Sequence, residues 1–261
     1  MKKLVSILAL FSSTIVALIF LFLLYFTIPL ISDSSFLKNF NIMPLLTSTL
    51  AIATLATTFA LFYSIAIAIF SYSLNKRFKN YIESFFVVLS SIPTVVYAFL
   101  GVILVVPFVR NIANCSGYSL IAAAFVLSFM ITPTIVLFLK DSFNATPTIY
   151  KDIIYSLGGK REDFELEILL KYNKKAIIVA SIMGFSRAIG DTMIALMVSG
   201  NAINYPNSLT TSIRALTAHI ALVFGEDFNS IEFKTIFASG LILFIISATI
   251  IIIIKRLNGV K

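Results

Sequence analysis

Six long apolar runs constrain the fold of this chain more than any other feature. The runs cover residues 4–31, 45–74, 82–109, 118–140, 175–199 and 233–254. A helix of about 20 apolar residues is long enough to cross the hydrocarbon core of a bilayer. The 261 residues are 59% hydrophobic and 12% charged, whereas a soluble domain carries about 25% charged residues. The sequence therefore predicts an all-α, polytopic membrane protein with six transmembrane helices in a single domain.

The distribution of Lys and Arg predicts the orientation of these helices. With the N-terminus inside, fifteen of the 20 basic residues lie in inner segments, four lie in outer segments, and Arg187 lies within an apolar run. Inner loops of membrane proteins carry the excess of Lys and Arg. We therefore expect both termini on the cytoplasmic side of the membrane, with the first run retained as a helix. Because the basic residues do not form one patch, the net charge of +8 does not indicate nucleic-acid binding.

Two charged residues, Arg187 and Asp191, lie within the fifth apolar run. Four residues apart on a helix, they share a face and can pair. Each charge costs roughly 2.5–3.5 kcal/mol near the centre of a bilayer. One interpretation is a structural pair that neutralises itself. The other is a substrate site, because a guanidinium matches the oxygens of an oxyanion bidentately, with Asp191 holding Arg187 extended between substrate visits.

Hydroxyl side chains lie next to Asp191 and on both sides of a predicted break in the third run. The candidates for a translocation pathway are Ser90, Ser91, Thr94 and Thr192. The first three flank Pro93, which interrupts the run, and Pro133 is expected to interrupt the fourth run in the same way. The alternative is that these hydroxyls satisfy the carbonyls that a proline kink leaves without donors.

A long inner connection, residues 141–174, joins the fourth and fifth runs. Its apolar stripe at helical spacing consists of Ile149, Ile153, Ile154 and Leu157. Thr146 and Pro147 are suited to starting this helix, and Gly158-Gly159 to ending it, before a second helix over 160–167. The connection is therefore an elbow of two short helices. The stripe either docks a partner or packs on the inner rim of the bundle.

The outer connection, residues 200–231, is also long. Ser208 is expected to cap a helix over residues 209–224. No set of residues in the chain indicates a cofactor, a metal site or an active site. The only His is His219, the only Cys is Cys115, and Gly159-Lys160 lacks the surroundings of a nucleotide-binding P-loop.

Several segments resemble the permeases of ABC importers. Residues 152–158, Asp-Ile-Ile-Tyr-Ser-Leu-Gly, are similar to the Glu-Ala-Ala loop of these permeases, with Asp152 in place of Glu and two Ile in place of Ala. Leu170-Lys171 stands where that loop ends in Leu-Pro. Residues 91–101, 105–107, 130–135, 186–193 and 213–222 resemble segments of the phosphate permeases. The resemblance covers residues 45–256 and is closer to the PstC-type than to the PstA-type subunit.

This resemblance implies the type I ABC importer (MetI-like) permease fold, with a core over residues 45–256. It implies a non-enzymatic transmembrane permease subunit in a bacterial inner membrane, which forms the path of an ATP-driven phosphate importer. The implied partners are a cytoplasmic ATPase dimer, a second permease of the PstA type, and an extracytoplasmic phosphate-binding protein. In such permeases the elbow is the coupling helix on the ATPase, and the matching residues here are Asp152, Ile153, Ile154, Leu157, Gly158 and Gly159. The family usually has Glu where this chain has Asp191.

Two other functions remain open from the sequence. A permease for another oxyanion, such as molybdate or tungstate, would carry a similar elbow, although the segments around Pro93 and Arg187 argue for phosphate. A secondary transporter would use the buried charges as an ion relay. The long amphipathic elbow disfavours that function, because a simple tether needs only a few residues.

Overall fold

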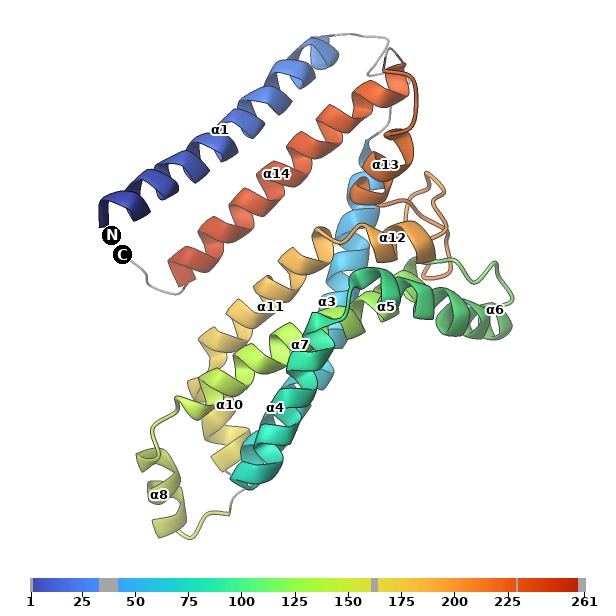
Figure 1. Ribbon diagram of the computed structural model, residues 1–261. Helices are drawn as coiled ribbons and strands as arrows, with labels where there is room; N and C mark the ends of the chain where they lie inside the picture. Colours follow the sequence, from blue (N-terminus) through green and yellow to red (C-terminus); the bar gives the residue numbers. More distant parts are fainter. Residues whose placement is uncertain (1, 33–41, 161–163, 229, 258–261) are drawn as a thin grey trace.

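The computed structural model describes residues 2–32, 42–160, 164–228 and 230–257, and these ranges are mostly helical (Figure 1). The helices are α1 (Lys2–Ser32), α3 (Met43–Ser73), α4 (Lys76–Ser91), α5 (Thr94–Leu100), η1 (Gly101–Val105), α6 (Val106–Ala113), α7 (Leu120–Asn144), α8 (Ile149–Ser156), η2 (Phe164–Leu169), α10 (Leu170–Tyr172), α11 (Lys174–Ile189), α12 (Met193–Val198), α13 (Leu216–Val223) and α14 (Ile231–Leu257). In the described ranges the only extended pairing is one parallel bridge between Gly200 and Ile213. The predicted all-α class is confirmed.

Four of the predicted spans are continuous helices. α1, α3, α7 and α14 match the first, second, fourth and sixth apolar runs to within a few residues, and each holds a stretch long and apolar enough to cross a membrane. Pro133 lies inside α7 and does not interrupt it, contrary to the prediction. A proline removes one backbone hydrogen bond, and the packing of α3 and α11 against α7 supports the helix through that point.

The third apolar run is not one helix. α4 ends at Ser91, Ile92 and Pro93 are extended, and α5 begins at Thr94. α5, η1 and α6 continue as one helical segment over Thr94–Ala113, the fifth that is long and apolar enough to span. The break at Pro93 was predicted correctly, but the spanning segment begins after it. α4 and α6 therefore run in different directions (Figure 1).

The fifth apolar run is also divided. α11 ends at Ile189 and α12 begins at Met193, with residues 190–192 between them. Neither helix alone is long enough to cross a bilayer, so the described residues contain five continuous candidate spans and one broken segment instead of six continuous helices. The break begins three residues after Arg187 and contains Asp191, and the candidate site is built around it.

The core of the bundle lies between α3 and α7, with α11 packed on both. Small, fully buried residues of both helices belong to this core, namely Ala53, Ala56 and Ala60 on α3 and Ala122, Ala123 and Ala124 on α7. Small side chains let helix backbones approach closely, which favours association of helices in a bilayer. Gly184 serves α11 in the same way, because a Cβ there would lie 2.7 Å from Cδ1 of Ile135.

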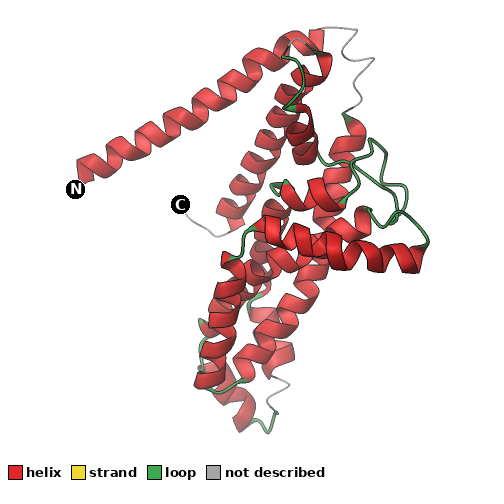
Figure 2. Ribbon diagram, turned by 45° about the vertical axis from the view of Figure 1, so that its right-hand side comes forward, coloured by secondary structure: helices red, strands yellow, loops and turns green. Residues whose placement is uncertain are grey.

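α1 and α14 form a pair beside this core (Figures 1 and 2). The ring of Phe26 stacks on that of Phe237 with centroids 4.6 Å apart. α14 also contacts α11 and α13. Most side chains of α1 are exposed, as expected for a helix that faces lipid or a neighbouring subunit.

The outer connection covers the start of α7. The backbone amides of Leu120 and Ile121 donate to the carbonyls of Thr211 and Leu209, at 3.0 and 2.9 Å. The first amides of a helix lack partners within the helix, so these bonds satisfy a buried helix start. They also hold residues 209–211 outside any helix. The predicted helix over 209–224 is therefore wrong in extent, and only α13 forms.

Candidate translocation site and coupling elbow

Arg187 lies in the last turn of α11, next to α7. Its Nη1 donates a hydrogen bond to the hydroxyl of Thr134, and Tyr97 of α5 lies close enough to experience its charge. The side chain is half-buried. Among the residues that the structure describes, no carboxylate lies within ion-pair distance of Arg187. Because a guanidinium has five N–H donors, most of its hydrogen-bonding capacity and its charge are available to an anion.

Asp191 does not pair with Arg187 as the spacing predicted. Its Oδ2 instead accepts the backbone amide of Ile194 at 2.8 Å, which caps α12. The Asp191 backbone carbonyl accepts the hydroxyl of Thr217 at 2.9 Å, and the residue is 8% exposed. The predicted pair fails because α11 ends before Asp191, so the two residues do not share a helical face.

Tyr97 bridges the break at Pro93. A proline has no amide hydrogen, so the carbonyl of Leu89, four residues before it, loses its helical donor. The Tyr97 hydroxyl donates to this carbonyl at 2.9 Å, in addition to the amide of Ile92 at 3.3 Å. The predicted donors do not serve it, because Ser90 and Ser91 both donate to the carbonyl of Val87. Tyr97 therefore joins α4, α5 and the surroundings of Arg187.

The remaining predicted hydroxyls lie on neighbouring helices. Thr94 is the half-buried first residue of α5, and Thr192 is half-buried directly before α12. α5 and α12 are in contact. A place for either hydroxyl in the pathway stays a prediction. Reasoning from charges and breaks missed Thr134 and Tyr97, although both lie within the segments that carry the resemblance to the phosphate permeases.

A cavity of about 290 Å³ is bordered by Tyr97. Its lining consists of Leu89, Tyr97, Leu100, Gly101, Leu104, Val105, Val126 and Phe129. Tyr97 has the one polar side chain of this lining and donates its proton to the carbonyl of Leu89, so an anion placed there would lose its hydration without gaining a charged partner. The cavity is therefore unsuited to an oxyanion, and Arg187 remains the candidate binding group.

The elbow begins with α8, and Gly158-Gly159 ends this helix as predicted. Gly158 has a φ of +80°, and the amides of Gly158 and Gly159 donate to the carbonyls of Tyr155 and Ile154 at 3.1 and 2.9 Å. This is the Schellman arrangement, in which a left-handed residue closes a helix. A Cβ at Gly158 would meet open space, so its backbone conformation is what favours glycine there.

The apolar stripe of the elbow is divided between two environments. Ile154 packs against the core of the bundle. Ile149, Ile153 and Leu157 are 60%, 47% and 80% exposed, and Asp152 beside them is also exposed. Packing on the rim of the bundle therefore accounts for Ile154 alone. The other three form an apolar surface that is exposed among the residues the structure describes.

Hydrogen bonds fix the base of the elbow. Nδ2 of Asn173 donates to the hydroxyl of Thr146 at 2.8 Å, which joins the two ends of the connection. Thr146 therefore does not cap α8, which begins three residues later. The hydroxyl of Ser73 at the end of α3 donates to Oε1 of Glu165 at 3.0 Å. The predicted second helix is seen from Phe164 onward, as η2, and its residues 161–163 lie outside the described ranges.

Comparison with known proteins identifies the family of the chain. The sequence profile described as "Binding-protein-dependent transport system inner membrane component" matches residues 64–260. The chain belongs to this family. It is thus a membrane component of a transport system.

Several curated relatives are similar over most of their length. YqgH of Bacillus subtilis strain 168, named as a probable ABC transporter permease protein, is 30% identical over 224 residues, which is 85% of this chain and 72% of that protein. A protein of Methanocaldococcus jannaschii named as a probable phosphate transport system permease, PstC, is 30% identical over 77% of this chain and 70% of its own. PstC of Pasteurella multocida is 29% identical over 80% and 71%.

A solved structure shows the same fold. One chain of the MetNI methionine ABC transporter, in an inward-facing conformation, superposes with a TM-score of 0.61 at 17% sequence identity. The match covers 82% of this chain and 93% of that chain. The predicted MetI-like fold of ABC importer permeases is confirmed.

Proposed function

We propose that the chain is the transmembrane permease subunit of an ATP-driven phosphate importer. The observation that carries this proposal is Arg187, a half-buried guanidinium beside a break in the fifth apolar run, whose described partner is a hydroxyl. Relatives named as phosphate permeases align over about four fifths of the chain, which indicates phosphate among the oxyanions.

Arg187 would bind phosphate through two parallel N–H···O bonds, for which the planar guanidinium is suited. The hydroxyl of Thr134, which accepts from Nη1 of Arg187, could donate its own proton to a remaining phosphate oxygen. Transport requires binding that is strong enough to admit the ion and weak enough to release it. A single guanidinium assisted by a neutral hydroxyl meets both requirements.

The elbow would couple this site to an ATPase. Ile149, Ile153 and Leu157 supply an exposed apolar face that fits a groove on a cytoplasmic ATPase subunit. The Schellman closure at Gly158 and the bond between Asn173 and Thr146 make the elbow a stiff lever. A stiff element can pass a push on its surface to α7 and α11, and a mobile loop cannot.

The path would be completed by a second permease, a PstA-type paralogue, and supplied by an extracytoplasmic phosphate-binding protein. Arg187 is only half-buried within one chain, as expected for a group close to an interface between two permeases. Lys79 and Lys140 lie at the end of the bundle that carries α8, whereas Arg110 lies in the last turn of α6 and Arg214 in the outer connection. This distribution supports an inside location for α8 and both termini.

Transport by the reconstituted complex tests the proposal. The chain would be purified with the ATPase, second permease and binding protein encoded beside it and placed in vesicles. We expect uptake of radiolabelled phosphate that requires ATP, survives an uncoupler, and competes with unlabelled phosphate but not with sulfate or molybdate. Phosphate uptake that is absent, together with uptake of molybdate, would show that molybdate is the substrate instead of phosphate. Uptake without ATP that collapses with an uncoupler would contradict the importer class.

A further inference from the structure

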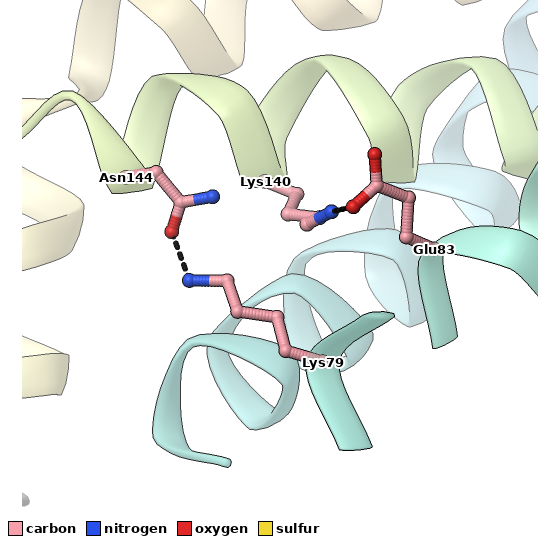
Figure 3. Close-up of polar contacts among 4 residues, drawn as sticks. All are labelled: Lys79, Glu83, Lys140 and Asn144. Carbon is pink, nitrogen blue, oxygen red and sulfur yellow. Dashed lines mark hydrogen bonds and ion pairs between the residues drawn. The ribbon is translucent and has the colours of Figure 1, made fainter. Parts of the chain in front are cut away.

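Two polar contacts join α4 to the inner end of α7 (Figure 3). Nζ of Lys140 donates to Oε2 of Glu83, and Nζ of Lys79 donates to Oδ1 of Asn144. The members on each helix are four residues apart and in opposite order, so the contacts lie one turn apart between antiparallel helices. We call these four residues the polar clamp.

The clamp is centred on a buried charge. The side chain of Lys140 is 5% exposed, whereas that of Glu83 is 48% exposed. A buried ammonium is tolerated only when it is paired, and Glu83 supplies the opposite charge. Lys79 is half-buried one turn away, and its pKa is lowered by burial and by the like charge of Lys140. The clamp therefore combines a partly buried ion pair, Lys140 with Glu83, and a more exposed contact, Lys79 with Asn144.

α4 has few other attachments to the bundle. Of its described side chains only Phe86 is buried, at 7% exposure. Phe78, Tyr81 and Phe85 on the same helix are 59%, 62% and 58% exposed. Apolar packing therefore fixes α4 only weakly on this chain, and the clamp accounts for much of its position against α7.

The position of the clamp connects the elbow with the candidate site. α7 continues through residues 145–148 directly into α8. α4 continues through Pro93 into α5, Tyr97 ties the two across that break, and α5 contacts α12, which follows the break beside Arg187. A displacement of α8 that moves the end of α7 would therefore displace α4 only if the clamp holds.

We propose that the polar clamp passes movement of the elbow to the region of Arg187, by holding α4 on α7. Lys140 and Glu83 are then positioning residues, which act through α4 and Tyr97 and do not touch the transported ion. This inference rests on the proposed coupling to an ATPase. It adds a second route between elbow and site, beside the direct connection through α11.

The test measures phosphate taken up per ATP hydrolysed by the complete reconstituted transporter. Glu83→Gln keeps the shape of the side chain and removes its charge. The pair Glu83→Lys with Lys140→Glu reverses both charges. Asp141→Asn is the matched control, since Asp141 is an exposed carboxylate next to Lys140 in the chain. We expect Glu83→Gln to lower the ratio by about tenfold, within the usual range of coupling between sites, the reversed pair to restore it, and the control to leave it unchanged.

Several results would overturn the inference. One is a wild-type ratio in Glu83→Gln. Another is a reversed pair that assembles with the ATPase and stays uncoupled. Failure of both variants to assemble would show that the contact is needed only for folding. Failure of the proposed function would look different. A wild-type complex that carries molybdate instead of phosphate would contradict the proposed substrate. The ratio of molybdate taken up to ATP hydrolysed would then still test the clamp.

Discussion

Arg187 and Lys140 are both basic residues on helices of the bundle, and they occupy opposite environments. Lys140 is buried and bonded to the carboxylate of Glu83, whereas Arg187 is half-buried and bonded to the hydroxyl of Thr134. A charge held by a carboxylate is neutralised within the protein. A charge held by a hydroxyl remains available to a ligand. The comparison separates a cation that holds helices together from a cation suited to binding an anion.

The largest expected effect is that of Arg187→Ala on transport. Without the guanidinium the pathway lacks its candidate anion-binding group, so we expect phosphate uptake to fall by about a hundredfold, as when a preorganised donor is removed. Co-purification with the ATPase should be unchanged, because Arg187 makes no ion pair with a described residue. Uptake above one tenth of the wild-type rate in an assembled complex would contradict the role of Arg187.

The contact of Lys140 should matter more than that of Arg187 for the stability of the protein, which is the reverse of their expected effects on transport. Glu83→Gln leaves Lys140 buried without an opposite charge, and we expect the free energy of unfolding to fall by about 2 kcal/mol. This is less than the loss for a fully buried pair, because Glu83 is half exposed. Arg187→Ala should change it by less than about 1 kcal/mol. Denaturant titration in detergent measures both, and equal losses would remove the distinction between the two sites.

Gly158→Ala tests the lever of the elbow. Alanine at a φ of +80° is strained by roughly 1 kcal/mol, although its Cβ would meet open space. We expect association with the ATPase to weaken about fivefold. Gly225→Ala is the control, because Gly225 has equal space and no positive φ. Equal binding by the two variants would show that the closure of α8 does not matter for docking.

The smallest effect is expected at Asp191. Asp191→Asn keeps an oxygen that can accept the amide of Ile194, so we expect uptake within about twofold of wild type, while Asp191→Ala loses the cap and about 1 kcal/mol of stability. Uptake assays on both variants decide the point. Loss of uptake in Asp191→Asn would assign the carboxylate to the substrate pathway in addition to the cap.

The sequence predicted most of the fold because apolar length and proline placement are local properties. The four continuous spans, the break at Pro93 and the glycine closure of α8 all follow from residues close together in the chain. The errors arose where distant segments compete for backbone groups. Residues 209–211 satisfy the start of α7 instead of forming a helix.

The candidate site was predictable in part. Arg187 stands out because a charge within an apolar run needs a reason. Its partner could not be deduced, because the break at residues 190–192 removed the expected pairing and the hydroxyl of Thr134 lies 53 residues away in the chain. The contact between Lys140 and Glu83 joins residues 57 positions apart. Spacing along one helix gives no information about such contacts between helices.

A charge-rescue measurement tests most directly whether the positive charge at residue 187 binds the transported anion. In a Cys115→Ser background, Arg187→Cys would be treated with a cationic thiol reagent and, separately, with a neutral reagent of similar size. We predict that phosphate uptake is lost in the untreated variant, recovers with the cationic reagent and does not recover with the neutral one. Full uptake in the untreated variant, or equal recovery with both reagents, would contradict the conclusion that a positive charge at this position binds the transported anion.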